Sequence, residues 1–487
     1  MSETKKSPSL KVNMIMNVIL TVSSMLFPII TFPYVSRVVG AEGIGKVTFV
    51  TSIVTYFSMF AQLGIPTYGI RICAKVRDNK EELSRVVHEI LIINVITCVI
   101  SYIALGIALF SVPRFAEEKV LFFVIGTTIL LNALGMEWLY KGLEQYSYIT
   151  IRSLIFKVIA IVALFLLVHN EADYIIYGGI TIFATAASNV LNFINARKYI
   201  TFRMLGNYQL KKHIKMVLVF FAMSIAITIY TNLDNVMLGF MKTDIDVGYY
   251  TAAVKIKLVL VSVVTSVSTV LLPRASYYVD KGLIDEFIAI AKRAMNFVIV
   301  FVIPCTIYFM IYAKEGILLL SGEEFIPAIP AMQVIMPTLL FIGITNILGI
   351  QMLVPLGKEK QVLYSTILGA VVDLIINIIM IPKYGAAGAA LGTTAAELTV
   401  LIYQIIIMKD VAKQVFVGTR WHIVFIGTVL AIASCLWVKQ LEWSSFIALA
   451  VSAVCFFGVY VVFLIITKEK IVFDVLEIVL NKLKKNG

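Results

Sequence analysis

The chain has 487 residues, of which 60% are apolar and 14% are charged, and its mean hydropathy is +0.94. This composition excludes an ordinary soluble globular protein and predicts an all-α membrane protein. The net charge of +12 would suit a nucleic acid, but most of the 41 Lys and Arg residues fall in alternate loops between apolar segments. Such a bias sets membrane orientation. We therefore expect both termini in the cytoplasm and no nucleic-acid partner.

About fourteen apolar segments of roughly 20 residues, the length that crosses a bilayer, follow one another along the chain. Six form a first group, at residues 13–35, 44–66, 86–111, 120–140, 149–168 and 174–195. Eight follow, at residues 214–239, 247–272, 287–312, 328–353, 361–381, 386–408, 421–438 and 445–467. We expect an N-terminal lobe at 1–205, a C-terminal lobe at 206–412, and a last helix pair with a basic tail at 413–487. The polar first residues show no small-residue cleavage motif, so we expect no removable signal peptide.

A glycine-containing segment recurs in the two halves of the chain. Residues 43–49 (GIGKVTF) align with residues 246–252 (DVGYYTA), and the same register matches Arg71 with Arg274. Two membrane bundles built on one plan predict a transporter whose site lies between the halves.

Proline and small residues mark special positions within the apolar segments. Pro28 and Pro33 interrupt the first segment, Pro304 the ninth, and Pro327, Pro330, Pro337 and Pro355 the tenth. Each predicts a kink, and a mobile gate is one interpretation for the first segment, although membrane helices are in general richer in proline. Residues 385–392 (GAAGAALG) predict a face for close helix packing.

The motifs predict no cofactor. Residues 40–46 (GAEGIGK) fit the start of a phosphate-binding loop, but Val47 follows where Mg²⁺ would need a hydroxyl, and no strand precedes. The five cysteines lack CxxC spacing and the four histidines lack an HExxH motif. We expect no ATP site, no metal, no disulfide and no catalytic residue.

Charged residues inside apolar segments are costly, so each needs a partner or a function. Lys255 and Lys257 lie within the eighth segment, and Asp234 lies at a similar depth in the seventh. An Asp234–Lys255 ion pair would leave Lys257 for a ligand. A structural pair with a snorkelling lysine is the alternative.

Five further cations would line a cationic cleft for an anionic headgroup, since Arg offers phosphate a planar fork of donors. They are Arg37, Lys46, Arg71, Arg274 and Arg152. For Arg37, Arg71 and Arg274, ordinary anchoring at the membrane interface is the alternative. The isolated acids Asp373 and Glu397 would bind a coupling cation or serve as hydrogen-bonded structural groups.

Several segments together resemble a known family. Residues 32–45 (FPYVSRVVGAEGIG) resemble the first-loop signature of bacterial polysaccharide flippases of the O-antigen and capsule type, and residues 138–144 (WLYKGLE) resemble their fourth-helix signature. Residues 247–250 and 385–392 are also similar. These flippases belong to the multidrug/oligosaccharidyl-lipid/polysaccharide exporter superfamily. The resemblance implies fourteen helices, arranged as two pseudosymmetric six-helix lobes around a central cleft plus a final pair.

The resemblance also implies a function. Such flippases move undecaprenyl-diphosphate-linked oligosaccharide from the cytoplasmic to the outer leaflet of the bacterial plasma membrane by alternating access, for surface polysaccharide biosynthesis. An inside-negative potential favours outward movement of negative charge by about 2.3 kcal/mol per charge per 100 mV, so an ion gradient or the potential would be the driving force. The expected partners are this lipid, the bilayer, and polysaccharide polymerase and assembly proteins.

Four other functions are less well supported. A multidrug/toxin extruder of the same superfamily would need acids in its cavity, whereas the mid-helix charges include Lys255 and Lys257. A lipid II flippase is a closer alternative. A membrane-embedded glycosyltransferase or ligase would need acidic catalytic or metal-binding motifs in a sizeable loop, and the loops are too short. A structural scaffold would need neither buried charges nor a duplicated bundle.

Overall fold

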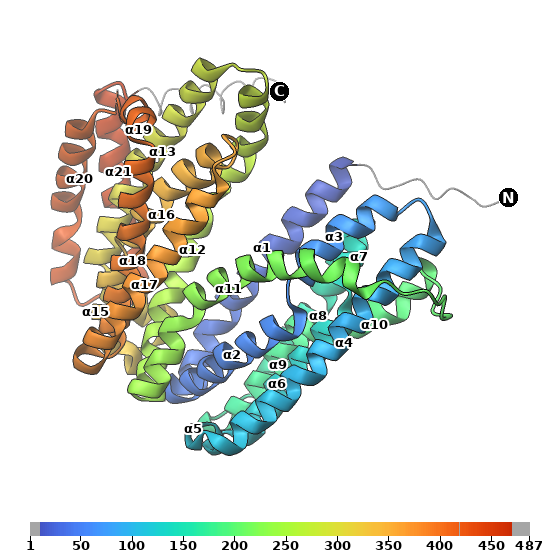
Figure 1. The fold of residues 1–487 in the computed structure, drawn as a ribbon. Helices are drawn as coiled ribbons and strands as arrows, with labels where there is room; N and C mark the ends of the chain where they lie inside the picture. Colours follow the sequence, from blue (N-terminus) through green and yellow to red (C-terminus); the bar gives the residue numbers. More distant parts are fainter. Residues whose placement is uncertain (1–9, 418, 470–487) are drawn as a thin grey trace, which may run out of the picture. The chain divides into compact units, whose positions relative to one another are not determined.

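The chain folds into helices joined by short loops (Figure 1). The computed structural model describes residues 10–417 and 419–469, and no strand occurs within these ranges. Internal contacts divide the chain into two compact units, Met1–Gly248 and Tyr249–Gly487. The expected all-α architecture is confirmed.

The helices of the first unit match the first seven predicted segments. The long ones are α1 (Leu10–Val38), α2 (Gly40–Gln62), α4 (Lys80–Ser111), α6 (Lys119–Gly135), α8 (Tyr146–Leu167) and α11 (Leu210–Met241). The shorter ones are α3 (Ile65–Val76), α5 (Pro113–Glu117), α7 (Glu137–Gly142), α9 (Tyr174–Ile182) and α10 (Asn189–Asn195). A π-helical turn, Phe183–Ala187, joins α9 to α10. The predicted sixth segment is therefore one helical stretch with a local change of winding.

The second unit holds the remaining predicted segments. Helix α12 (Asp244–Asp280) begins in the first unit and continues into the second. The others are α13 (Ile284–Ile311), α14 (Ala313–Ser321), α15 (Ile329–Ile335), α16 (Thr338–Thr345), α17 (Glu359–Tyr384), α18 (Ala386–Ile407), α19 (Lys409–Phe416), α20 (Trp421–Cys435) and α21 (Ser445–Ile466). A second π-helical turn, Asn346–Leu353, continues α16.

The number of membrane spans agrees with the sequence. Among the described residues, thirteen helices are long and apolar enough to cross a membrane, and a fourteenth is formed if Glu323–Ile335 and Thr338–Leu353 count as one span bent by 41°. Pro337 lies in the break of that span, so the kink predicted there is confirmed. Helix α1 runs through Pro28 and Pro33, and α13 runs through Pro304, each without a break, so the kinks expected there stay predictions.

Helix α4 shows how a membrane helix divides its surface. Val95, Val99, Ile103 and Ile107, four residues apart, are each at least half exposed, whereas Leu105 is buried against neighbours. This exposed apolar stripe suits contact with lipid, not water. The helix begins six residues before the predicted segment because the Asn79 side chain caps it and its first turns are charged.

The small-residue run 385–392 packs α18 against α17, as predicted. A Cβ atom at Gly388 would overlap the carbonyl oxygen of Met380, and one at Gly392 would overlap the Asn377 side chain. Glycine is required at both positions because the two helices approach this closely.

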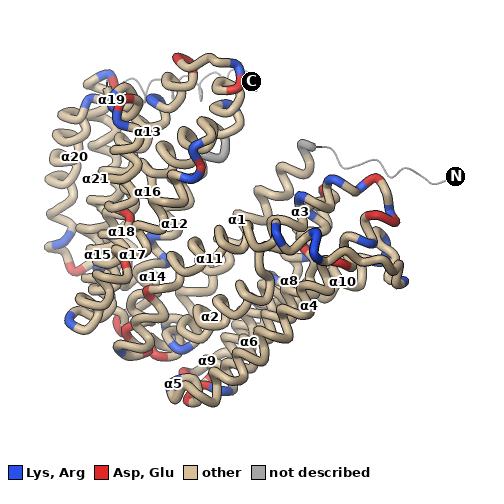
Figure 2. Tube along the Cα trace, viewed as in Figure 1, with Lys and Arg blue, Asp and Glu red and all other residues tan. Residues whose placement is uncertain are grey.

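The charged residues concentrate at helix ends and in loops, whereas the middle stretches of the long helices are largely uncharged (Figure 2). The expected lobe boundary at residue 206 lies in the long basic loop of residues 197–215, which the sequence suggests as the hinge between the lobes, and it stays a prediction. The basic tail at 470–487 lies outside the described residues.

Candidate functional site

A cavity of about 420 Å³ lies within the first unit, between α2, α6, α11 and the π-helical turn that follows α9. We call it the hydroxyl cavity, because most of its lining side chains are hydroxyls or amides. These are Thr51, Thr55, Ser58, Gln62, Thr128, Asn132, Thr181, Thr185, Ser224 and Thr228. The other lining residues, all of them described, are apolar, and none of the lining side chains carries a charge.

Many of these hydroxyls already donate to their own helix. Thr55 donates to the carbonyl oxygen four residues earlier at 2.7 Å, Thr181 does so at 3.0 Å and Ser224 at 3.1 Å. A hydroxyl has one donor and two acceptor lone pairs, so each keeps lone pairs for a ligand that donates hydrogen bonds. The cavity wall is therefore neutral and rich in acceptors.

One wall of the cavity leads to a buried cation. Asn189 Nδ2 donates to Asn132 Oδ1 at 3.1 Å, and Arg152 Nη1 donates to Asn189 Oδ1 at 3.3 Å and to the Ser188 carbonyl at 2.6 Å. Arg152 is 6% exposed, and its Nε is buried with no partner among the described residues. Arg152 was predicted to bind substrate, and the structure places it behind Asn189; a direct contact with substrate stays a prediction.

Lys157 is a second buried cation on α8. Its ammonium donates to Ser23 Oγ at 3.0 Å and to Ser24 Oγ at 2.8 Å, both on α1. Within the described residues, neither Lys157 nor Arg152 forms an ion pair. Neutral oxygens accept the hydrogen bonds of both cations, and no described carboxylate lies within ion-pair distance of either, so each positive charge is held without a direct counter-ion.

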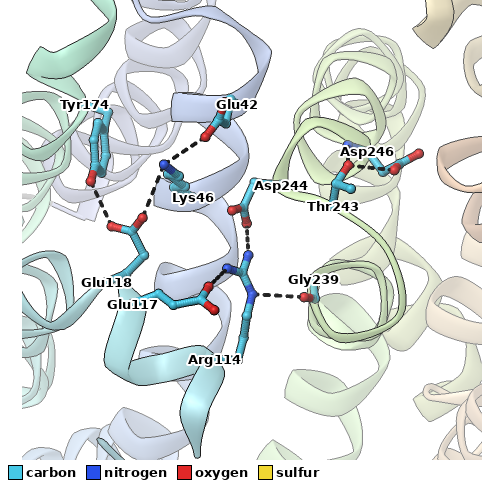
Figure 3. Close-up of polar contacts among 10 residues, drawn as sticks. All are labelled: Glu42, Lys46, Arg114, Glu117, Glu118, Tyr174, Gly239, Thr243, Asp244 and Asp246. Carbon is cyan, nitrogen blue, oxygen red and sulfur yellow. Dashed lines mark hydrogen bonds and ion pairs between the residues drawn. The ribbon is translucent and has the colours of Figure 1, made fainter.

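A second polar feature joins helix ends and includes Arg114 of α5 (Figure 3). The Arg114 guanidinium donates to the carboxylates of Glu117 and Asp244, and to the Gly239 carbonyl at 3.3 Å. Burial alone would lower the pKa of Arg114, but the two carboxylates more than offset this and raise the pKa. Asp244 is the first residue of α12, where the helix dipole also favours a negative charge.

Lys46 belongs to the same region and is held by two carboxylates. Its ammonium lies 2.9 Å from Glu42 and 3.3 Å from Glu118, and Tyr174 donates to Glu118 at 2.9 Å (Figure 3). The ammonium is also 5.0 Å from the Tyr174 ring centre. The two carboxylates thus neutralise the charge of Lys46 in this structure. The contact with a substrate headgroup that we expected for Lys46 is not tested and stays a prediction. We call these contacts, together with those of Arg114, the ion-pair cluster.

The repeated glycine segments lie against each other beside this cluster. A Cβ atom at Gly45 would overlap the carbonyl oxygen of Asp244, and one at Gly248 would overlap the carbonyl oxygen of Ala41. In the register of the repeat, Ala41 matches Asp244 and Gly45 matches Gly248. Each segment therefore contacts the equivalent position of the other, as at a twofold axis. The starts of α2 and α12 meet backbone to backbone.

The two predicted lysines lie on α12 in the second unit. Lys255 and Lys257 are both half-buried, and Lys255 makes no hydrogen bond or ion pair with any described residue. Asp234 is buried in α11 of the first unit. The expected Asp234–Lys255 pair would join the two units and stays a prediction.

The predicted arginines at helix ends are exposed. Arg37 donates to the Pro33 carbonyl of its own helix at 2.6 Å, and Arg274 donates to the Tyr278 hydroxyl at 3.1 Å with its guanidinium 5.7 Å from that ring. Arg71 is exposed on α3. These local contacts are compatible with interfacial anchoring and with a role in binding.

The two predicted acids of the second unit, Asp373 and Glu397, are buried. Asp373 is 1% exposed and accepts a hydrogen bond from Asn377 at 3.2 Å, and Glu397 is 8% exposed. In the part of the chain that the structure describes, no three His, Cys, Asp or Glu side chains gather as a metal site requires.

The family model described as "Polysaccharide biosynthesis protein" matches residues 10–279, more than half of the chain. The chain belongs to this family. Proteins of Escherichia coli K12 and Shigella dysenteriae, each named "Putative O-antigen transporter", are 22% and 25% identical to it. The alignments cover 82% of this chain and 97% and 100% of those relatives.

Solved structures share the fold of this family member. The lipid II flippase MurJ in an inward closed conformation has a TM-score of 0.72 at 17% identity, covering 94% of this chain and 99% of that one. An inward-facing multidrug resistance transporter of the MATE family and MOP superfamily has a TM-score of 0.59 at 13% identity, covering 83% and 99%. The chain is thus a multi-pass membrane protein that shares the fold of these two proteins.

The hydroxyl cavity and Arg114 were not predicted from the sequence. The sequence does contain a pattern that could have indicated the cavity: pairs of polar residues four positions apart, which face the same side of a helix. Such pairs are Thr51/Thr55, Ser58/Gln62, Thr128/Asn132, Thr181/Thr185 and Ser224/Thr228. No sequence pattern indicates the role of Arg114, because it is a charged residue between two apolar segments, like many others. Its partner Asp244 lies 130 positions away in the sequence.

Proposed function

We propose that this family member is a flippase. It moves undecaprenyl-diphosphate-linked oligosaccharide from the cytoplasmic to the outer leaflet of a bacterial plasma membrane, for surface polysaccharide biosynthesis. It is a transporter with no catalytic residue, and polysaccharide polymerase and assembly proteins would use its product. The relatives named as O-antigen transporters support this substrate class.

One observation carries the proposal: three cations within membrane-crossing helices, Arg152, Lys157 and Lys255, form no ion pair with a carboxylate of the described residues. Arg152 and Lys157 are satisfied by neutral oxygens, and Lys255 makes no polar contact with the described residues. Removing charge from water is expensive, so unpaired cations in a membrane protein are expected to serve a ligand of opposite charge. A diphosphate is such a ligand, and it cannot cross hydrocarbon unaided.

Lys255 and Lys257 are the residues that we expect to contact the diphosphate directly. Arg37, Lys46, Arg71, Arg274 and Arg152 would extend the electropositive route from one leaflet to the other. The two lobes would expose this route first to the cytoplasm and then to the outside, by alternating access. With both termini cytoplasmic, the ion-pair cluster would lie at the outer end of the first unit.

The driving force would be the membrane potential or an ion gradient. A potential of 100 mV, negative inside, favours outward movement of each negative charge by about 2.3 kcal/mol. Asp234, Asp373 and Glu397 would serve either a coupling cation or structural pairing. A cation-coupled drug extruder is the second candidate, because Asp373 and Glu397 are buried acids in membrane-crossing helices.

The proposal is tested with purified protein in liposomes, a fluorescent diphosphate-linked oligosaccharide and no ATP. We expect flipping by the wild type and a loss of about tenfold or more in Lys255→Gln and Lys257→Gln, since a hydrogen bond to a charged group contributes about 1.5–3 kcal/mol. Lys281→Gln, exposed just beyond the same helix, is the matched control and should flip normally. Efflux of cationic dyes with no lipid transfer would instead assign the chain to the drug extruders.

A further inference from the structure

We propose that the hydroxyl cavity binds the sugar portion of the transported lipid, apart from the cations that hold its diphosphate. This inference rests on the proposed function and adds to it a subsite for an uncharged ligand part. It predicts that residues of the first unit select the glycan, whereas Lys255 and Lys257 recognise a group common to all such lipids.

The donor and acceptor pattern of the cavity suits sugars. Pairs of polar residues four apart on α2, α6, α11 and the stretch after α9 all face the same space. Thr55, Thr181 and Ser224 use their own proton within the helix, so their lone pairs accept from a ligand. A sugar offers many hydroxyl donors, and each also accepts.

Two side chains of the cavity, Thr128 and Asn132, each have one hydrogen-bonding atom that lacks a partner among the described residues. Thr128 Oγ1 is buried and makes no hydrogen bond with any described residue. Asn132 uses its Oδ1 to accept from Asn189, and its Nδ2 makes no hydrogen bond within the described ranges. Because a buried hydroxyl without a partner costs free energy, its presence at a cavity wall points to a ligand or water that completes it.

The charge of the cavity excludes the headgroup as its occupant. A diphosphate needs cations or several backbone N–H groups, and none of the described lining residues is charged. A prenyl tail would prefer a wall of apolar side chains only. The volume of about 420 Å³ falls within the roughly 300–1,000 Å³ of small-ligand sites. Of the three parts of the transported lipid, the neutral, hydroxyl-rich sugar portion therefore suits the cavity best.

Arg152 acts on this subsite as a positioning residue. Its guanidinium fixes the Asn189 amide, which in turn fixes Asn132. The orientation of Asn132 Nδ2 toward a ligand would therefore depend on a side chain that does not itself line the cavity. Arg152→Lys keeps the charge but lacks the planar fork, so it should weaken glycan selection.

The first test compares two lipids in proteoliposomes: undecaprenyl diphosphate carrying the oligosaccharide, and the same lipid diphosphate without sugar. Thr128→Val removes one hydroxyl at nearly constant shape. We expect the apparent affinity for the glycan-bearing lipid to fall about three- to tenfold, as for one lost hydrogen bond, and that for the sugar-free lipid to stay the same. Thr127→Val, whose hydroxyl lies on the exposed side of the same helix, is the control and should change neither.

The outcomes separate the two proposals. If the wild type flips neither lipid, the proposed function fails. If it flips both and Thr128→Val leaves the ratio of the two affinities unchanged, the glycan subsite is wrong while the flippase stands. Thr181→Val applies the same test to a residue on another helix, so the glycan subsite can still be tested if Thr128→Val folds poorly.

A second measurement asks what occupies the cavity, using Thr55→Cys and a small thiol reagent. The native cysteines are buried except Cys455, which is half-buried, so the background carries Cys455→Ser. Glycan-bearing lipid and free oligosaccharide should both slow labelling several-fold, the lipid at lower concentration, and inorganic diphosphate should not. Protection by diphosphate or by the sugar-free lipid alone would overturn the inference.

Discussion

The ion-pair cluster and the hydroxyl cavity belong to the same unit, yet they use opposite chemistry. The cluster joins full charges, with Arg114 between Asp244 and Glu117 and Lys46 between Glu42 and Glu118. The cavity, which lies along the membrane-crossing helices, is lined by hydroxyls and amides. A charged side chain costs little free energy at a helix end near water and several kcal/mol in the apolar layer of the membrane. The access of water therefore explains why one region uses ion pairs and the other uses neutral polar groups.

Arg152 and Lys157 do not follow this division, because they are charged residues within the apolar layer. They are 6% exposed, lie within a membrane-crossing helix, and have neutral partners among the described residues. In the ion-pair cluster a cation stabilises the fold through its carboxylates. On α8 a cation gains no such partner, so its contribution to stability should be small and its contribution to function large.

The largest expected effect on stability concerns Asp244. Asp244→Ala should lower the free energy of unfolding by about 2–3 kcal/mol, because it leaves the partly buried Arg114 without its best-shielded carboxylate. Thermal and denaturant unfolding in detergent measure this. Glu117→Ala, at the 61% exposed partner of the same arginine, should change stability by less than about 0.5 kcal/mol. Equal effects at the two positions would contradict the ranking by burial.

The close contact between the starts of α2 and α12 can be tested with two glycine-to-alanine substitutions, which we expect to change the free energy of unfolding in opposite directions. Gly45→Ala should destabilise by about 1–3 kcal/mol, since the added Cβ overlaps the Asp244 backbone. Gly106→Ala, at a helical glycine with open space around it, should instead stabilise by up to about 1 kcal/mol. The same unfolding assays apply, and a neutral Gly45→Ala would show that the contact is looser than the structure has it.

Arg152 should separate stability from function. Arg152→Met should change the free energy of unfolding by no more than about 1 kcal/mol, because the substitution also removes a buried charge that has no carboxylate within ion-pair distance among the described residues. Lipid flipping should nevertheless fall about tenfold. A loss of several kcal/mol in stability with normal flipping would make Arg152 a structural residue.

The smallest effect is expected at the exposed edge of the cluster. Glu42→Gln removes a carboxylate that is 60% exposed while Lys46 keeps Glu118, so stability should fall by about 0.5 kcal/mol or less and the difference should vanish at high salt. A larger, salt-independent loss would mean that Glu42 is more shielded than its exposure indicates.

The sequence predicted the helices well because apolar length is the main signal in a membrane protein. Residues 445–467 and 287–312 were within a few residues of α21 and α13. It missed α3, α14 and α19, which are short and follow a longer helix, where composition alone shows no boundary. The small-residue pattern at residues 385–392 correctly marked the close packing of α17 and α18, whereas the contact between the two repeated glycine segments was not predicted.

The site was predicted less completely, for physical reasons. Charges inside apolar segments are easy to recognise, so Arg152, Lys255 and Lys257 were selected. Threonine is common in membrane helices and satisfies itself within the helix, so Thr128 and Thr181 attracted no attention. Pairing between distant loops, as between Arg114 and Asp244, requires the fold itself. Neutralisation of Lys46 by Glu118 likewise became visible only in three dimensions.

The most direct test of the account is the initial rate of lipid flipping in proteoliposomes under an imposed membrane potential, with a cationic dye as the competing cargo. The account predicts transfer of diphosphate-linked oligosaccharide without ATP, faster toward the positive side, and no dye transport. Transport of the dye with no movement of the lipid at either potential would contradict it.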